Sequence, residues 1–171
     1  MIRVLVVEDT PSHLADAVRV AGEMGIEIVT RTYASEAASD ISSGHSRSPF
    51  HEPDPDKKFD GVVADIYMPY SKDPRWNVQD SPAGLGVAAA AFAHGVPFVI
   101  CTAGYHHGAK YEWIHSMTYV LKWPLMEGAD GHRPDGSYDK DYEAPSKPWK
   151  AAFEFLMRRI DGQEEEGEDA E

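Results

Sequence analysis

Residues 4–11 read Val-Leu-Val-Val-Glu-Asp-Thr-Pro, and this stretch indicates how the chain begins to fold. A run that is apolar throughout is typical of a strand covered on both faces, as in a parallel sheet. Two acids end the run, and Thr10 followed by Pro11 suits the start of a helix, with threonine as N-cap and proline at the first helical position. The stretch therefore predicts a buried strand that leads directly into a helix.

The same alternation of strand and helix recurs along the chain. The predicted strands are short runs rich in β-branched side chains, at residues 2–7, 26–29, 61–64, 97–102 and 119–121. The predicted helices are residues 11–25, 34–41, 84–94, 109–116 and 147–160. Five strands that alternate with five helices indicate an α/β fold with a doubly wound, five-stranded parallel sheet. Right-handed crossovers favour the flavodoxin-like strand order 2-1-3-4-5.

Length and charge indicate one domain followed by an acidic tail. The chain has 171 residues, of which 42% are apolar and 26% charged, as in ordinary globular domains. Its net charge is −13, and residues 161–171 contain seven acids and no base. This composition is typical of a disordered segment. We therefore expect a domain over residues 1–160 and a disordered tail over residues 161–171.

Composition also excludes several classes of function. The rest of the chain is acidic too, so it lacks the basic surface with which proteins neutralise nucleic-acid phosphates. A single cysteine, Cys101, cannot form an internal disulfide. The apolar run at the N-terminus is too short for a signal peptide, and no run approaches the roughly 18 apolar residues of a membrane span. We expect a cytoplasmic protein with no nucleic-acid or membrane partner.

Three segments are longer than usual connections between strands and helices. They are residues 42–58, 70–83 and 125–146, all rich in proline, glycine, serine and aspartate. By strand polarity, the first lies at the far end of the sheet. The other two follow the third and fifth strands, so we expect them to rim the edge where ligands bind in such folds.

Polar side chains end several of the predicted strands. The first strand ends at Glu8 and Asp9, the third at Asp65, and the fourth at Thr102, while Lys122 directly follows the fifth. The carboxyl ends of parallel strands meet at one edge of the sheet, so these side chains are expected to converge. Each one taken alone is an ordinary polar residue at a strand end.

Their combined chemistry suits phosphoryl transfer with a divalent metal. Mg²⁺ prefers oxygen ligands, usually one or two carboxylates with water and phosphate oxygens. Neighbouring carboxylates repel one another unless a cation offsets their charge. A lysine that faces them can neutralise charge on a transferred phosphoryl group.

With these residues, the sequence resembles the receiver domain of two-component response regulators. The matching segments are residues 4–9, 65–69 (Asp-Ile-Tyr-Met-Pro), 83–85, 102–103 and 119–122 (Tyr-Val-Leu-Lys), in the order of the family and at the expected strand ends. One departure is Trp123, which separates Lys122 from Pro124, whereas the family places proline directly after its lysine.

The resemblance implies a role for each matching residue. Asp65 would take a phosphoryl group from a phosphohistidine as an acyl phosphate. Glu8, Asp9, Asp65 and the main-chain carbonyl of Tyr67 would hold Mg²⁺. Lys122 would pair with the phosphoryl oxygens, Thr102 would hydrogen-bond one of them, and Tyr119 would be the switch aromatic that turns inward with the threonine.

These roles imply a stand-alone response regulator that is a phosphoacceptor switch. It would catalyse only its own phosphotransfer and a slow dephosphorylation. Its donor would be a histidine kinase or a histidine phosphotransfer protein, and it would signal through contacts with an unidentified downstream protein. The alternative is an interaction module that has kept the receiver fold and works without phosphorylation. Metal-dependent phosphohydrolases are disfavoured, because neither Asp9 nor Asp65 begins the Asp-x-Asp pattern that they need.

Overall fold

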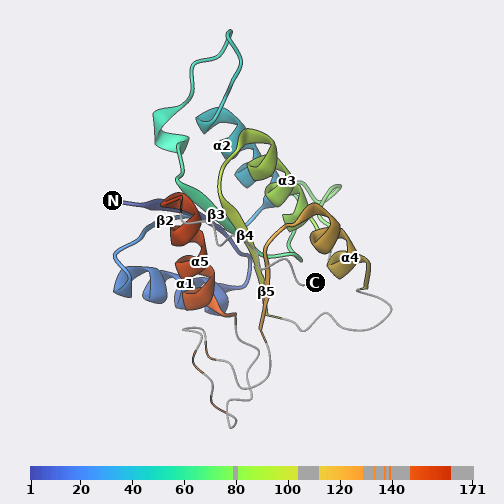
Figure 1. Cartoon of the computed structure of the whole chain (residues 1–171). Coiled ribbons are helices and arrows are strands. Elements are labelled where there is room, and N and C mark those ends of the chain that lie inside the picture. The colour runs from blue at the N-terminus through green and yellow to red at the C-terminus, as the bar shows by residue number, and fades with distance from the viewer. Residues whose placement is uncertain are drawn as a thin grey trace.

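Five parallel strands form one sheet with helices on both faces (Figure 1). The computed structural model describes residues 1–78, 81–103, 112–128, 133, 137, 139 and 147–162. The strands are β1 Arg3–Val7, β2 Glu27–Arg31, β3 Gly61–Ala64, β4 Phe98–Thr102 and β5 Leu125–Glu127. The α-helices are α1 Pro11–Glu23, α2 Ala34–Gly44, α3 Gly84–His94, α4 Glu112–Leu121 and α5 Trp149–Ile160, and a short 3-10 helix, η1, spans Pro55–Lys57.

The strand order is β2-β1-β3-β4-β5, and every pairing is parallel. This confirms the predicted doubly wound fold and its order 2-1-3-4-5. Four strands and four helices also lie within a few residues of their predicted positions. The exceptions are α4 and β5, which the sequence placed too early.

Each face of the sheet contributes to its own apolar core. Val4 and Val6 pack with α1 and α5 on one face, while Leu5 and Val7 pack with α2, α3 and Ile114 of α4 on the other. The four side chains from Val4 to Val7 are fully buried, whereas Arg3, the first residue of β1, is partly exposed. Burial on both faces is the reason why these four residues are all apolar rather than alternately apolar and polar.

The predicted strand at residues 119–121 is wrong, because these residues form the last turn of α4. Its buried residues, Ile114 and Thr118, are four positions apart, which is the spacing of one helix face. The strand comes after the helix, at Leu125–Glu127, and pairs with β4. A short run of β-branched and aromatic residues does not by itself distinguish the end of a helix from a strand.

The segment 42–58 is fastened to the body by charged and close backbone contacts. Asp40 on α2 forms ion pairs with Arg31 at 2.6 Å and with Lys57 of η1 at 3.3 Å. Gly44 lies so close to η1 that a Cβ atom there would stand 1.8 Å from the carbonyl oxygen of Lys57. The segment joins α2 to β3, so it lies at the far edge of the sheet, as predicted.

Two predicted regions lie largely outside the described residues. They are the tail, of which residues 161 and 162 are described, and the segment 125–146, of which β5, Gly128 and three isolated residues are described. Among the described helices, none is both long enough and apolar enough to cross a membrane.

Candidate functional site

Three carboxylates meet at the carboxyl edge of the sheet. Glu8 and Asp9 follow β1, and Asp65 follows β3, the neighbouring strand. One oxygen from each side chain lies within 4.8 Å of the others. Glu8 is fully buried, Asp65 is 8% exposed, and Asp9 faces solvent. The structure therefore brings together the three acids that the sequence singled out.

A lysine that the sequence reasoning missed completes this cluster. Nζ of Lys147 lies 2.9 Å from Oδ1 of Asp65 and donates a hydrogen bond to Oε2 of Glu8. Lys147 is 1% exposed. It precedes α5, and its carbonyl oxygen accepts a hydrogen bond from the amide of Trp149 at 2.8 Å. Trp149 is itself fully buried, so the start of α5 holds the ammonium group in place.

The charges of the cluster shift the pKa values of Asp9 and Lys147. Partial loss of water around Asp9 and the negative charge of Asp65 raise the pKa of the Asp9 carboxyl, against smaller opposing effects that include Lys147 and His13. Burial acts to lower the pKa of Lys147, but Asp65 and then Glu8 outweigh it, so the pKa of Lys147 is raised. The ammonium therefore stays charged and neutralises one of the three carboxylates.

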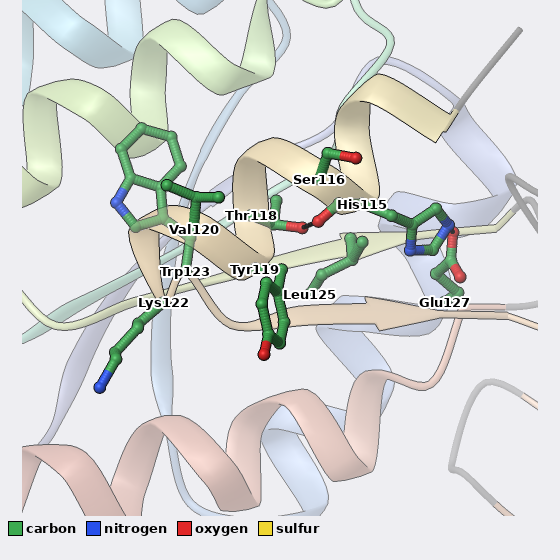
Figure 2. A pocket seen from close by; sticks show the side chains of 9 residues that line it. All are labelled: His115, Ser116, Thr118, Tyr119, Val120, Lys122, Trp123, Leu125 and Glu127. Atoms are coloured by element: carbon green, nitrogen blue, oxygen red, sulfur yellow. Dashed lines mark hydrogen bonds and ion pairs between the residues drawn. The ribbon is translucent and has the colours of Figure 1, made fainter.

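The expectation that Lys122 lies at this site is wrong. Lys122 is exposed and directly follows α4, the helix that leads into β5, so it belongs to the opposite edge of the sheet. Its φ of 53° places it in the left-handed region, where it ends the helix together with the hydrogen bond from the Trp123 amide to Thr118. Figure 2 shows its side chain at one end of an open groove of about 950 Å³ beside α4 and β5.

Tyr119 does not occupy the position expected of a switch aromatic either. It lies on α4 and is 85% exposed, on the same groove as Lys122 (Figure 2). The three residues of β5, by contrast, are Leu125, Met126 and Glu127, and none is aromatic. The inference for Tyr119 depended on its distance in sequence from Lys122, so it fails together with that assignment.

One sequence signal could have identified Lys147. Residues 147–148 read Lys-Pro and directly precede the last helix, whereas Trp123 separates Lys122 from Pro124. The Lys-Pro pair therefore matches the family pattern better than Lys122 does. Residues 128–146 separate the Lys-Pro pair from β5. Because of this long separation, the pair was not recognised as the lysine that follows the fifth strand.

Thr102 lies at the carboxyl edge, as the sequence predicted. It ends β4, is 3% exposed and pairs in register with Glu127 of β5. Its carbonyl oxygen accepts a hydrogen bond from the amide of Gly128 at 2.7 Å. The neighbouring Cys101 is fully buried, and loss of water raises the pKa of its thiol to about 12, so the thiol is unreactive in the folded protein.

Tyr67 and the segment that follows it form a cavity beside the acids. The cavity has a volume of about 360 Å³ and is lined by Asp9, Tyr33, Tyr67, Met68, Pro69, Asn77 and Val78. Backbone hydrogen bonds from Ala34 and Ser35 to the carbonyls of Pro69 and Tyr70 fix the start of this segment to α2. Lys72 adds an ion pair of 2.9 Å with Glu36. The segment after Tyr67 therefore borders the site on the side of Asp9.

Gly84 at the start of α3 allows the close packing behind Asp65. A Cβ atom on Gly84 would lie 1.6 Å from the carbonyl oxygen of Asp65. Only glycine fits there without moving the backbone of the central acid.

The donor set fits one divalent cation. Glu8, Asp9 and Asp65 carry three negative charges when ionised and Lys147 carries one positive charge, so the cluster has a net charge of −2. All three acids offer the oxygen ligands that Mg²⁺ and similar ions prefer. Tyr67 lines the same cavity as Asp9, the most exposed of the three acids.

No model of a protein family matches the sequence, and no curated protein matches it. Several solved structures are similar to this chain in fold. The receiver domain of a modulated diguanylate cyclase from Desulfovibrio desulfuricans G20 has a TM-score of 0.56 at 14% identity, covering 95% of this chain and 98% of that one. A CheY-like receiver domain protein from Methanospirillum hungatei JF-1 has a TM-score of 0.55 at 15% identity, covering 98% and 99%.

A third similar structure is a de novo designed Rossmann 2x3 protein, with a TM-score of 0.53 at 14% identity, covering 100% of this chain and 99% of that one. Because a design can share this topology, the fold alone does not establish an activity. The resemblance to receiver domains is nevertheless confirmed at the level of structure: the chain has the fold of a response regulator receiver domain.

Proposed function

We propose that this chain is a phosphorylation switch in which Asp65 accepts a phosphoryl group from a phosphohistidine. The observation that carries the proposal is the contact of the buried Lys147 ammonium with Asp65, beside Glu8 and Asp9. A lysine that only stabilised the fold would need one carboxylate partner, whereas Lys147 contacts both Glu8 and Asp65 and a third acid, Asp9, lies beside them. The arrangement suits a reaction that brings further positive charge and phosphate oxygens to the same place.

In the proposed reaction, a carboxylate oxygen of Asp65 attacks phosphorus and forms an acyl phosphate. The phosphorus–nitrogen bond of the donor breaks, and its electron pair returns to the imidazole, which leaves and takes up a proton. Lys147 neutralises charge on the phosphoryl oxygens, and the hydroxyl of Thr102 donates a hydrogen bond to one of them. Both residues would position the phosphoryl group and stabilise the negative charge on its oxygens. Positioning and charge stabilisation are most of what phosphoryl transfer needs from a protein.

Mg²⁺, when bound, would neutralise the phosphoryl oxygens as they approach the acids. Asp9, Asp65 and the main-chain carbonyl of Tyr67 would hold it, with Glu8 contributing directly or through water. In this proposal Lys147 also acts on Glu8. By pairing with Glu8, it gives a fully buried carboxylate at the end of β1 an oppositely charged partner.

Under this proposal the chain is a phosphoacceptor rather than an enzyme that acts on other substrates. A histidine kinase or a histidine phosphotransfer protein would be its donor, and a downstream protein would read the phosphorylated state by direct contact. Exposed apolar side chains on α4, among them Tyr119 and Val120, lie on a surface available for such a contact.

The test is the mass of the full chain after incubation with Mg²⁺ and either a small acyl phosphate or a phosphorylated histidine phosphotransfer protein. We expect a gain of one phosphoryl group that maps to Asp65 and is absent from Asp65→Asn. The matched control is Asp56→Asn, since Asp56 is exposed in η1 at the far edge. Labelling of Asp65→Asn at the level of the control would contradict the proposal. No labelling of the unaltered chain by either donor would favour the alternative, an interaction module that works without phosphorylation.

A further inference from the structure

The segment that follows Tyr67 exposes apolar side chains next to the acidic cluster. Tyr70 is 49% exposed, Trp76 62% and Val78 63%. Single exposed apolar residues are common on protein surfaces, whereas three within the nine residues 70–78 are a concentration that a partner can cover. The proposed reaction itself gives these three side chains no task.

The charged side chains of residues 70–78 have partners of opposite charge. Nζ of Lys72 lies 2.9 Å from Oε1 of Glu36, and Nη2 of Arg75 lies 2.5 Å from Oδ2 of Asp73. Backbone hydrogen bonds also tie the start of the segment to α2. The segment therefore presents its apolar side chains from an anchored backbone on which the charges are already paired.

The cavity of about 360 Å³ connects this segment to the acidic cluster. Asn77 and Val78 line it together with Asp9, one of the three acids, and with the side chains of Tyr33 and Tyr67. Carboxylate, amide and phenol oxygens all accept hydrogen bonds, so the lining suits the N–H groups of a basic side chain. The cavity can therefore receive one basic side chain of a partner that covers the neighbouring apolar residues.

Position and charge both favour the phosphodonor as this partner. An oxygen of Asp65 lies within 4.8 Å of an oxygen of Asp9, which also lines the cavity. A protein whose phosphohistidine meets Asp65 therefore has its surface next to residues 70–78. The whole chain carries a net charge of −13, which attracts a partner with positive charges around its histidine.

We propose that residues 70–78 and the adjoining cavity are a docking surface for a protein that carries the phosphohistidine. Apolar side chains of this donor cover Trp76 and Val78, and one of its basic side chains enters the cavity. The inference rests on the proposed function and names the surface by which the site recognises its donor. A small phosphodonor has no side chains to place there, so its reaction does not depend on this surface.

The test compares two donors on the full chain with Mg²⁺. They are acetyl phosphate and a phosphorylated histidine phosphotransfer protein whose histidine is surrounded by basic residues. In Trp76→Ser, the concentration of the protein donor that gives half-maximal labelling of Asp65 should rise about tenfold. The maximal rate with this donor and the rate with acetyl phosphate should stay within about twofold, since Trp76 contributes to docking and not to the reaction.

Phe50→Ser is the matched control, because Phe50 is 87% exposed in the segment 42–58 at the far edge of the sheet. It should leave labelling by both donors unchanged. If Trp76→Ser and the unaltered chain need the same concentration of the protein donor, the inference is wrong while the proposed function stands. A loss of labelling in Trp76→Ser that is equal for both donors would also overturn it.

Two variants of opposite charge give a second measure. Trp76→Glu and Trp76→Arg both remove the ring, but against a basic donor surface the arginine variant should need a several-fold higher concentration of the protein donor than the glutamate variant. Equal values or the reverse order would reject contact between this segment and the basic residues of the donor. If acetyl phosphate labels the unaltered chain and the protein donor does not, the docking inference is wrong, although Asp65 remains a phosphoacceptor. If neither donor labels it, both the inference and the proposed function are wrong.

Discussion

Nζ of Lys147 lies 2.9 Å from Oδ1 of Asp65 and also donates a hydrogen bond to Glu8, a residue 139 positions earlier in the chain. One buried ammonium therefore joins the end of β1, the end of β3 and the start of α5. The charge of the acidic cluster and the packing of the last helix are thus parts of one arrangement.

Replacing this lysine should affect both stability and phosphorylation. Lys147→Met removes the positive charge and leaves Glu8 buried without its ion pair, which typically costs about 3 to 5 kcal/mol. The free energy of unfolding, measured in denaturant without divalent metal, should fall by an amount of this order. The rate of labelling from a small acyl phosphate should fall at least tenfold under conditions where the variant is still folded.

Lys122→Met is the matched control for this prediction. Lys122 is exposed at the end of α4, so its replacement should leave the labelling rate within about twofold and change the stability by less than about 0.5 kcal/mol. If Lys122→Met instead abolishes labelling and Lys147→Met does not, the assignment of Lys147 to the site is wrong.

Divalent metal should stabilise the folded chain. The acids come together only in the folded state, so at ten times the dissociation constant the metal should add about 1.4 kcal/mol and raise the melting temperature by about 3 to 6 °C. Asp9→Ala should remove most of this rise, which can be measured by calorimetry with and without millimolar Mg²⁺. In Asp56→Ala the rise should remain. A full rise in Asp9→Ala would mean that the metal binds elsewhere.

The phosphorylated form should be long-lived because Tyr67 and the segment after it restrict water. Hydrolysis needs a water about 3 Å from phosphorus on the in-line path. Tyr67, Asn77 and Val78 line the cavity next to Asp9, where such a water would enter. Tyr67→Asn should therefore speed the decay of the acyl phosphate several-fold at constant Mg²⁺.

Tyr70→Asn serves as the control for that measurement, since the Tyr70 side chain is 49% exposed and the residue meets α2 through its backbone. Its decay should match that of the unaltered chain. A decay that is rapid already and equal in all three proteins would show that Tyr67 does not limit access of water.

Mild acid should destabilise the chain through His45. Nε2 of His45 accepts a hydrogen bond from the amide of the buried Phe59 at 3.1 Å, so the folded state needs the neutral ring. Burial, followed by the nearby His94 and Lys58, lowers the pKa of His45. The unfolded chain then binds more protons. The stability that the neutral His45 ring contributes is complete above the unfolded pKa of about 6.5. It is lost as the pH falls from there toward the lower folded pKa.

The measurement is the free energy of unfolding at pH 7.5 and pH 5.5. His45→Gln, whose amide oxygen can accept the same hydrogen bond, should lose less stability over this interval than the unaltered chain. His51→Gln, in an exposed part of the same segment, should behave like the unaltered chain. An equal loss in both variants would exclude His45 as the titrating group.

Most of the fold could be predicted because β1, β3 and β4 are buried apolar runs and β2 is a partly buried run with β-branched residues, each beside a clear helix pattern. The sequence also correctly placed Glu8, Asp9, Asp65 and Thr102, since the carboxyl ends of parallel strands share one edge. It failed at Tyr119 and Lys122, where three apolar residues at the end of a helix resemble a strand and a lysine happens to follow them. Lys147 was missed because it comes long after β5, whereas the family pattern suggested a lysine close to the end of the fifth strand.

The two sides of the connection between β5 and Lys147 are anchored independently of each other. β5 is held by its ladder with β4 and by the hydrogen bond from Gly128 to Thr102, while Lys147 is held by the acids and by the burial of Trp149. Ile2 and Ile160, close to the two ends of the described body, pack against the same core. A circular permutant that starts between residues 129 and 146, with residue 162 linked to residue 1, should therefore assemble the same site. In such a protein the lysine would be the first functional group to leave the ribosome, and the acids would fold against it.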